Sequence, residues 1–169
     1  MSDARTVSAQ IGRPLRAPSE VVVRCHLSMP VVISVPPFLD DGTPFPTRYW
    51  LTCPLAVTRI ARLEAAGGVK RMETKAEMEP EFGAGLEEAN RRYASQRDAL
   101  VPEGAYPRPS GGVGGARRGA KCLHAHYADW AAGNENPVGE LVGAWIGPLD
   151  CDIPCVVEGE ANPDWSPRP

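Results

Sequence analysis

The fold class follows from residues 21–52, which read VVVRCHLSMPVVISVPPFLDDGTPFPTRYWLT. Three runs in this stretch are rich in β-branched and aromatic residues, the types that favour strands, and they cover residues 21–25, 30–35 and 47–52. The first link is short enough for a hairpin, and the second carries turn residues at positions 40–44. Strands that follow one another in this way usually pair as neighbours. The sequence therefore predicts a small antiparallel sheet of about three strands.

Helical periodicity begins after the strands. The clearest helix is expected over residues 80–101, because Phe82, Leu86, Ala89 and Tyr93 recur at the spacing of one helix face. Four further helices are expected to begin near Pro54, Lys70, Ala120 and Pro137. These segments predict a single α+β domain over residues 19–148, with about five helices packed on the sheet.

The two ends of the chain lack such patterns. Residues 1–18 are polar and are expected to form a flexible arm, and residues 149–169 are expected to form an acidic, proline-rich tail. The tail contains Cys151 and Cys155. We interpret these two cysteines as incidental, because chain ends are usually poorly ordered.

Composition excludes several classes of function. The net charge is −3, so no overall basic field attracts nucleic acid. No stretch approaches the roughly 18 apolar residues of a membrane-spanning helix, and the first residues lack the apolar core of a signal peptide. The five cysteines are an odd number, which argues against a disulfide framework. These features predict a cytoplasmic protein that neither binds nucleic acid nor inserts into a membrane.

The scarcest reactive side chains gather in residues 121–126, KCLHAH, where two of the three histidines lie close to a cysteine. If Cys122 is already helical, it shares a helix face with His126, and both can reach one zinc ion. If the helix begins later, His124 takes the place of His126. Such a site needs further ligands, and the candidates are two cysteines at strand ends, Cys53 and Cys25.

Two other interpretations of these residues stay open. Without a metal, Cys122 at a helix N-terminus is the outline of a nucleophilic cysteine, with His126 or His124 as its base. In the plainest interpretation, Cys25 and Cys53 are buried as small hydrophobic side chains and the histidines lie on the surface.

A glycine-rich basic stretch, residues 111–121, precedes this motif. Its backbone amides, together with Arg117, Arg118 and Lys121, could hold a phosphate or carboxylate at the start of a helix. The stretch is not a P-loop, because Ala120 stands where that motif requires lysine. A flexible loop with solvated arginines is the competing interpretation.

Several motifs resemble the actinobacterial family known as domain of unknown function 501. They are Asp41-Gly-Thr-Pro-Phe-Pro-Thr-Arg-Tyr-Trp-Leu-Thr-Cys-Pro54, Arg62-Leu-Glu-Ala-Ala-Gly67, Lys121-Cys-Leu-His124 and Asn136-Pro-Val-Gly139. The resemblance covers roughly residues 21–147 and implies a small cytosolic bacterial protein. Family members are often encoded near a septum-formation initiator, enolase and an exopolyphosphatase-like protein, which implies a protein partner linked to cell division or the envelope. The family has no established activity, so the resemblance assigns no catalytic residue.

Two functions are therefore expected. The first is a regulatory or interaction protein that binds a metal, with zinc as the candidate, or a small anion. The second is a zinc- or cysteine-dependent hydrolase or transferase that acts on a phosphorylated or carboxylate substrate. An open metal coordination position would favour the enzyme, and four protein ligands would favour a structural metal.

Overall fold

The computed structural model describes residues 2–167. Its main sheet consists of β1 (Glu20–Arg24), β2 (Pro30–Ser34) and β3 (Tyr49–Leu51). The strands are antiparallel in the order β1-β2-β3, with Val21 opposite Ile33 and Val32 opposite Leu51. This arrangement confirms the predicted three-stranded meander.

The central strand β2 is buried along its whole length. Its side chains contribute to two cores, because residues of a strand point to both faces of the sheet. Val32 belongs to the larger core with residues of α2–α6, whereas Ile33 and Val35 belong to a smaller core with Val7. Since both faces of the sheet are covered at this strand, its sequence is a continuous run of apolar residues and does not alternate between apolar and polar residues.

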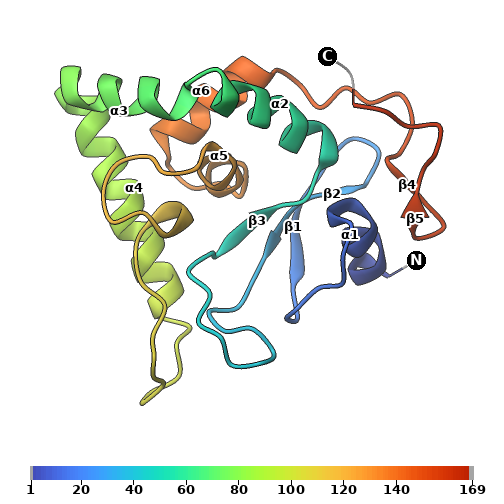
Figure 1. Cartoon of the computed structure of the whole chain (residues 1–169), viewed down its shortest axis with the longest axis horizontal. Helices are drawn as coiled ribbons and strands as arrows, with labels where there is room; N and C mark the ends of the chain where they lie inside the picture. Colours follow the sequence, from blue (N-terminus) through green and yellow to red (C-terminus); the bar gives the residue numbers. More distant parts are fainter. Residues whose placement is uncertain (1, 168–169) are drawn as a thin grey trace.

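The helices are α1 (Asp3–Ile11), α2 (Pro54–Ala65), α3 (Gly68–Met78), α4 (Pro80–Asp98), α5 (Leu123–Ala131) and α6 (Pro137–Ile146). Proline is the first residue of α2, α4 and α6, where its missing N–H costs nothing and its fixed φ suits the helix. A left-handed Gly67, with φ of 82°, separates α2 from α3. The helices α2–α6 lie together on one side of the sheet (Figure 1). The predicted α+β class is confirmed.

Both chain ends differ from the expected arm and tail. Residues 3–11 form α1, and its Val7 is buried against the sheet. The last part of the chain forms a small hairpin of β4 (Val156–Val157) and β5 (Glu160–Ala161), which lies beside α1 (Figure 1). The polar composition of these segments concealed the few apolar positions, such as Val7 and Val156, that dock them.

The connection from α4 to α5 is long but packed. It contains a short helical turn, η1 (Val113–Gly115), whose Val113 is fully buried. Asn90 accepts a hydrogen bond from the Val113 amide at 2.9 Å and donates one to the Gly119 carbonyl at 3.1 Å. Buried Arg97 donates to the Gly111 carbonyl at 2.6 Å. These bonds anchor the glycine-rich stretch to α4.

Among the helices of the described residues, none combines the length and the apolar character that a bilayer crossing requires.

Candidate functional site

The start of α5 determines which histidine faces Cys122. Cys122 is the N-cap of α5, with extended backbone angles (φ −148°, ψ 115°), so the helix begins one residue later at Leu123. The Cys122 carbonyl still accepts the first helical hydrogen bond, from the His126 amide at 3.2 Å, but the Cys122 thiol faces His124. This is the second of the two arrangements considered from the sequence, in which His124 is the partner of the thiol.

Cys122, His124 and Glu64 bring a sulfur, a nitrogen and an oxygen together. The Nδ1 atom of His124 lies 4.0 Å from Cys122 Sγ and 3.2 Å from Glu64 Oε1. The three ligand atoms all lie within 4.8 Å of one another, and each side chain is half-buried. Across residues 2–167, no other set of three or more His, Cys, Asp or Glu side chains is gathered this closely.

Glu64 reaches this site from the last turn of α2. Its Oε1 atom also accepts a hydrogen bond from the Leu123 amide at 2.7 Å. That amide is one of the unpaired donors at the N-terminus of α5, where a negative charge is favourable. A carboxylate in the last turn of a helix is unfavourable for its own helix dipole. This local conflict is a sequence signal at Glu64, a residue that is not among the predicted ligands.

The second ring nitrogen of His124 is bound to the backbone. Its Nε2–H donates to the Val57 carbonyl at 3.1 Å. Burial alone would lower the pKa of His124, but the hydrogen bond with Cys122 and the charge of Glu64 outweigh it and raise the pKa to about 9. Without a metal, the ring is therefore a cation at neutral pH, paired with Glu64.

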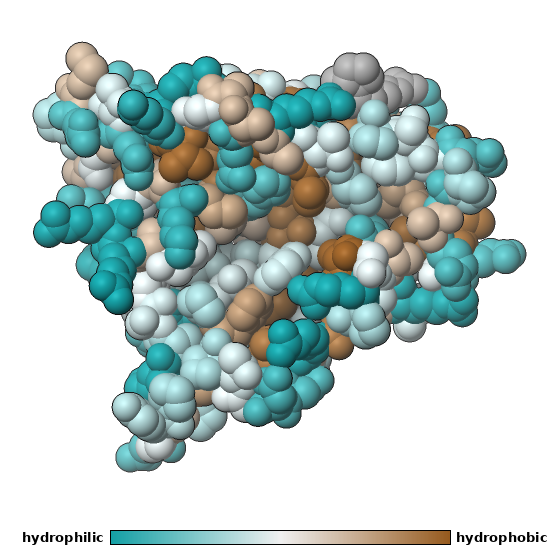
Figure 2. All heavy atoms as spheres, viewed as in Figure 1, coloured by the Kyte–Doolittle hydropathy of each residue, from teal (hydrophilic) through white to brown (hydrophobic). Residues whose placement is uncertain are grey.

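A cavity of about 360 Å³ opens beside this cluster. Its lining residues come from β3, α2, η1 and α5; they are Thr47, Tyr49, Trp50, Leu51, Val57, Gly114, Cys122, His124 and Ala125. In the space-filling view, hydrophobic side chains reach the surface in the middle of the face on which these elements meet (Figure 2). Small-molecule sites have volumes of roughly 300–1,000 Å³ and mostly apolar linings, so this cavity can admit a small ligand.

The other predicted ligands lie outside this group. Cys25 and Cys53 are not part of the cluster of Glu64, Cys122 and His124. His126 is fully buried, and its Nδ1–H donates to Asn136 Oδ1 at 3.0 Å. Burial lowers the pKa of His126 to about 4 despite that hydrogen bond, so its ring is neutral.

Asp129 is fully buried in the same part of α5. Its carboxylate binds Arg92 and accepts a hydrogen bond from Asn136 Nδ2 at 2.9 Å. His126 and Asp129 thus belong to a buried network that joins α5 to α4 and to the start of α6, away from the Cys122 thiol.

The residues predicted to bind an anion are exposed. The side chains of Arg117, Arg118 and Lys121 face solvent. Arg118 borders a surface hollow whose other charged residues are acidic; they are Glu73, Glu77 and Glu87. The Leu123 amide at the N-terminus of α5 is already occupied by Glu64. An anion in this loop would therefore be held by the exposed cationic side chains and not by this amide.

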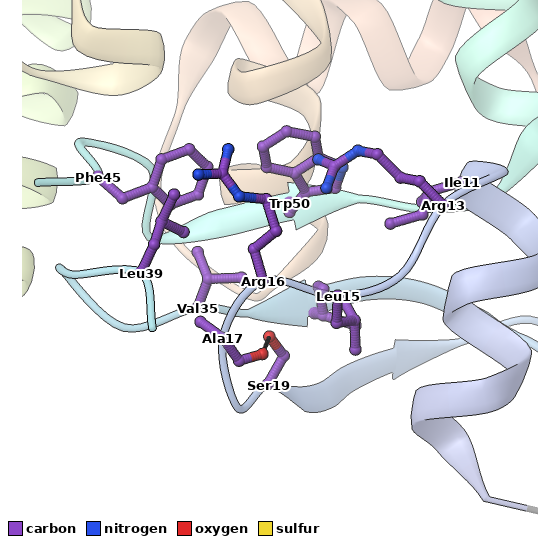
Figure 3. A pocket seen from close by; sticks show the side chains of 11 residues that line it. Ile11, Arg13, Leu15, Arg16, Ala17, Ser19, Val35, Leu39, Phe45 and Trp50 are labelled. Carbon is purple, nitrogen blue, oxygen red and sulfur yellow. Dashed lines mark hydrogen bonds between the residues drawn. The ribbon is translucent and has the colours of Figure 1, made fainter. Parts of the chain in front are cut away.

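Two other hollows are less suited to a substrate. One, of about 60 Å³, is lined by Arg13, Arg16, Phe45 and Trp50 among others (Figure 3). There Phe45 stacks on Trp50, and Arg16 is paired with Asp41 at 2.8 Å. The other is a larger surface hollow of about 730 Å³ bordered by Glu88, Glu135 and Glu140, and its Arg92 is engaged by Asp129. The first is too small for most ligands, and among the described residues neither hollow contains a close group of metal ligands.

A family model described as a protein of unknown function (DUF501) matches residues 21–144. Neither a curated protein nor a solved structure matches the chain. The matched residues include the sheet, Glu64, Cys122 and His124. The segment that contains Cys151 and Cys155 lies outside them.

Proposed function

The chain belongs to the DUF501 family, a family of unknown function, and we propose that its Glu64, Cys122 and His124 bind a divalent transition metal. Zinc is the metal that best suits this ligand set, because it binds thiolate, imidazole and carboxylate in one tetrahedral site. The observation that carries the proposal is the convergence of these three ligand atoms within 4.8 Å.

The hydrogen bonds around His124 support a metal ligand. Metal-binding histidines usually donate their other ring N–H to a carbonyl or carboxylate, which fixes the tautomer and the ring orientation. His124 does this through Nε2 and the Val57 carbonyl. With that nitrogen held, the lone pair of Nδ1 is directed at the same space as Cys122 Sγ and Glu64 Oε1, and the metal replaces the proton on Nδ1.

The cavity beside the site favours an open coordination position. Three protein ligands leave the fourth zinc position to water or to a bound molecule. The cavity of about 360 Å³ shares Cys122 and His124 with the site and is otherwise largely apolar. A ligand with a carboxylate or phosphate group could then bind the metal with its polar end and occupy the cavity with its apolar part. This arrangement supports a regulatory protein that senses a small anion through its metal.

A hydrolase or transferase remains the second candidate, because an open zinc position can also activate water or polarise a substrate. A metal-free cysteine nucleophile is less well supported. In such a pair one imidazole nitrogen faces the thiol and the other faces an orienting group. Here the Val57 carbonyl holds Nε2 of His124, but Nδ1 lies 3.2 Å from Glu64 Oε1 and 4.0 Å from Cys122 Sγ, so it pairs with the carboxylate and not with the thiol.

Metal titration of the reduced, chelator-treated full chain tests the proposal. Zn²⁺ affinity is measured against a chromophoric competitor for wild type, His124→Ala and Cys122→Ser. We expect each variant to lose one bound equivalent, or to lose more affinity than the roughly 10–100-fold that an outer-shell change costs. Glu73→Gln is the control, because Glu73 borders the acidic hollow by Arg118 and is not in the ligand set.

Two outcomes would decide between the candidates. If His124→Ala and Cys122→Ser bind zinc as wild type does, the proposed site is wrong. If the metal is bound, phosphate and simple carboxylates are added while the fluorescence of Trp50, which lines the cavity, is followed with Trp50→Phe as reference. A saturable change supports a sensor, whereas turnover of a phosphate or carboxylate ester supports the enzyme.

A further inference from the structure

The other four cysteines lie around one end of the central strand. Cys25 follows β1, and its amide donates to the Met29 carbonyl at 3.0 Å. Cys53 follows β3, and its amide donates to the Val31 carbonyl at 3.4 Å. Because β2 lies between β1 and β3, these two cysteines flank the start of β2 from its two sides.

The C-terminal segment brings Cys155 to the same place. Gln10 of α1 donates from Nε2 to the Pro30 carbonyl at 2.8 Å and to Cys155 Sγ at 3.4 Å. One amide group thus joins the first residue of β2 to the Cys155 thiol. An ion pair between Arg5 and Glu160, at 3.1 Å, holds the β4–β5 hairpin on the same helix.

Cys151 is held there by two aromatic side chains. His26, the neighbour of Cys25, donates from Nε2 to the Cys151 carbonyl at 2.9 Å. Trp165 donates from Nε1 to Cys151 Sγ at 3.4 Å. Cys151 and Cys25 both pack against the larger core that contains buried Cys53. The segment expected to be an irregular tail therefore carries its two thiols back to the sheet.

The thiols also lie close enough to influence one another. Burial raises the pKa of Cys53 to about 11, and the neighbouring Cys155 and Cys151 add to the rise. Burial also raises the pKa of Cys155, and the neighbouring Cys25 and Cys151 add to that rise. Charges influence one another in this way only at short range, so these thiols are near neighbours.

We propose that Cys25, Cys53, Cys151 and Cys155 form a tetrathiolate site for zinc that fastens the C-terminal segment to the sheet. This site is separate from the one formed by Glu64, Cys122 and His124. Four protein ligands leave no open position, so its role is structural. On binding, four S–H bonds are replaced by four Zn–S bonds and four protons pass to solvent, with no change in oxidation state.

A metal fits the spacing of Cys25 and Cys53 better than a disulfide does. A whole strand separates them, and neighbouring strands lie about 4.7–4.9 Å apart. Two such spacings exceed the roughly 4.4–6.8 Å between Cα atoms that a disulfide permits. Two Zn–S bonds of about 2.3 Å each bridge a larger distance between two cysteines than one S–S bond does.

Closing the site requires the C-terminal segment to move towards the sheet. Within residues 2–167, no three of these sulfurs lie within 4.8 Å of one another. Cys151 and Cys155 are on an irregular segment between α6 and the β4–β5 hairpin, which can approach the sheet more easily than the strands can separate. The N–H groups of Gln10 and Trp165 already point at two of the sulfurs, as outer-shell donors to metal thiolates do.

Cobalt substitution in a variant that lacks the other site is the direct test. The full chain with Cys122→Ser and His124→Ala is reduced, treated with chelator and titrated with Co²⁺. We expect one equivalent with the charge-transfer absorption of a tetrahedral tetrathiolate, displaced by Zn²⁺. Adding Cys151→Ser and Cys155→Ser should abolish it. No binding by the first variant, or unchanged absorption in the second, would overturn the proposal.

The variant with all four substitutions, at Cys122, His124, Cys151 and Cys155, could fail to fold. Alkylation followed by mass spectrometry tests the site without it. It uses the chain with Cys122→Ser and His124→Ala. Added Zn²⁺ should protect all four remaining cysteines together, and chelator should expose them again. Equal labelling of Cys151 and Cys155 with and without Zn²⁺ would contradict the site. So would a Cys151–Cys155 disulfide in protein kept under cytoplasm-like reducing conditions.

Discussion

Arg92 of α4 and Asp129 of α5 form a two-pronged ion pair, with Nη1–Oδ1 at 3.1 Å and Nη2–Oδ2 at 2.6 Å. The Asp129 side chain is fully buried, and Arg92 is about one-fifth exposed. Asn136 donates to the same carboxylate and, through its own Oδ1, accepts from the Gly139 amide and from His126. The pair thereby ties α4 to α5 and to the cap of α6, and α5 carries Cys122 and His124 at its start.

Removing Arg92 should destabilise the protein strongly. Arg92→Ala leaves the Asp129 carboxylate buried without its cation, which typically costs about 3–5 kcal/mol. Arg91→Ala is the matched control, since Arg91 pairs with exposed Glu88, and surface pairs are worth about 0–1 kcal/mol. Urea denaturation of both variants measures the difference. If both variants lost the same free energy of unfolding, the burial of Asp129 would not be the cause of the loss in Arg92→Ala.

The long helix α4 should depend on its buried face. Leu86 is about 2% exposed and belongs to the larger core, so Leu86→Ala should lower the free energy of unfolding by roughly 2–5 kcal/mol. Met78→Ala, at a side chain that is 77% exposed, should change it by less than about 0.5 kcal/mol. A comparably small change for Leu86→Ala would mean that this face is not part of the core.

Alkaline pH should unfold the protein partly through Tyr93. Burial raises the pKa of Tyr93 from 10.0 to about 12, although the amides of Arg48 and Tyr49 donate to its oxygen. The pKa of Tyr93 is higher in the folded than in the unfolded protein. The protonated Tyr93 side chain therefore contributes its full stabilisation of the fold below pH 10, and this contribution is lost as pH rises through about 12.

The measurement is the free energy of unfolding against pH in wild type and Tyr93→Phe. Between pH 10 and 12 the wild type should lose up to about 1.4 kcal/mol per pH unit more than the variant, the slope for one proton. If the two proteins gave parallel curves, Tyr93 would have the same pKa in the folded and the unfolded state.

The charge of Glu64 should be visible at His124 in the metal-free protein. Glu64→Gln removes a carboxylate that lies 3.2 Å from His124 Nδ1, so the pKa of His124 should fall from about 9 towards its usual value. Nuclear magnetic resonance titration of the ring protons measures this shift, with Glu73→Gln as the control. An unchanged His124 pKa would show that the two side chains are not in contact in solution.

Local patterns predicted the regular elements because their causes are local. The β-branched runs became β1–β3, and the prolines at 54, 80 and 137 begin α2, α4 and α6. The helix α1 was missed because its polar composition hides a single buried apolar position, Val7, next to buried Thr6. The hairpin β4–β5 was missed because its strands are only two residues long. Such short elements persist through contacts with the rest of the fold, which no local pattern reveals.

The sequence by itself determined the three-stranded meander, the helices that follow it, and the concentration of Cys122 with two histidines. Only the tertiary structure decided which side chains meet. The helix α5 begins at Leu123 and not near Ala120, and this later start exchanged His126 for His124 as the partner of Cys122, because side-chain direction in a helix turns by a fixed angle per residue. The packing of α2 on α5 then supplied Glu64, which is 58 residues from Cys122 along the chain, and the C-terminal segment brought Cys151 and Cys155 to the sheet. Contacts between distant segments depend on how whole elements pack, and spacing along the chain does not encode that geometry.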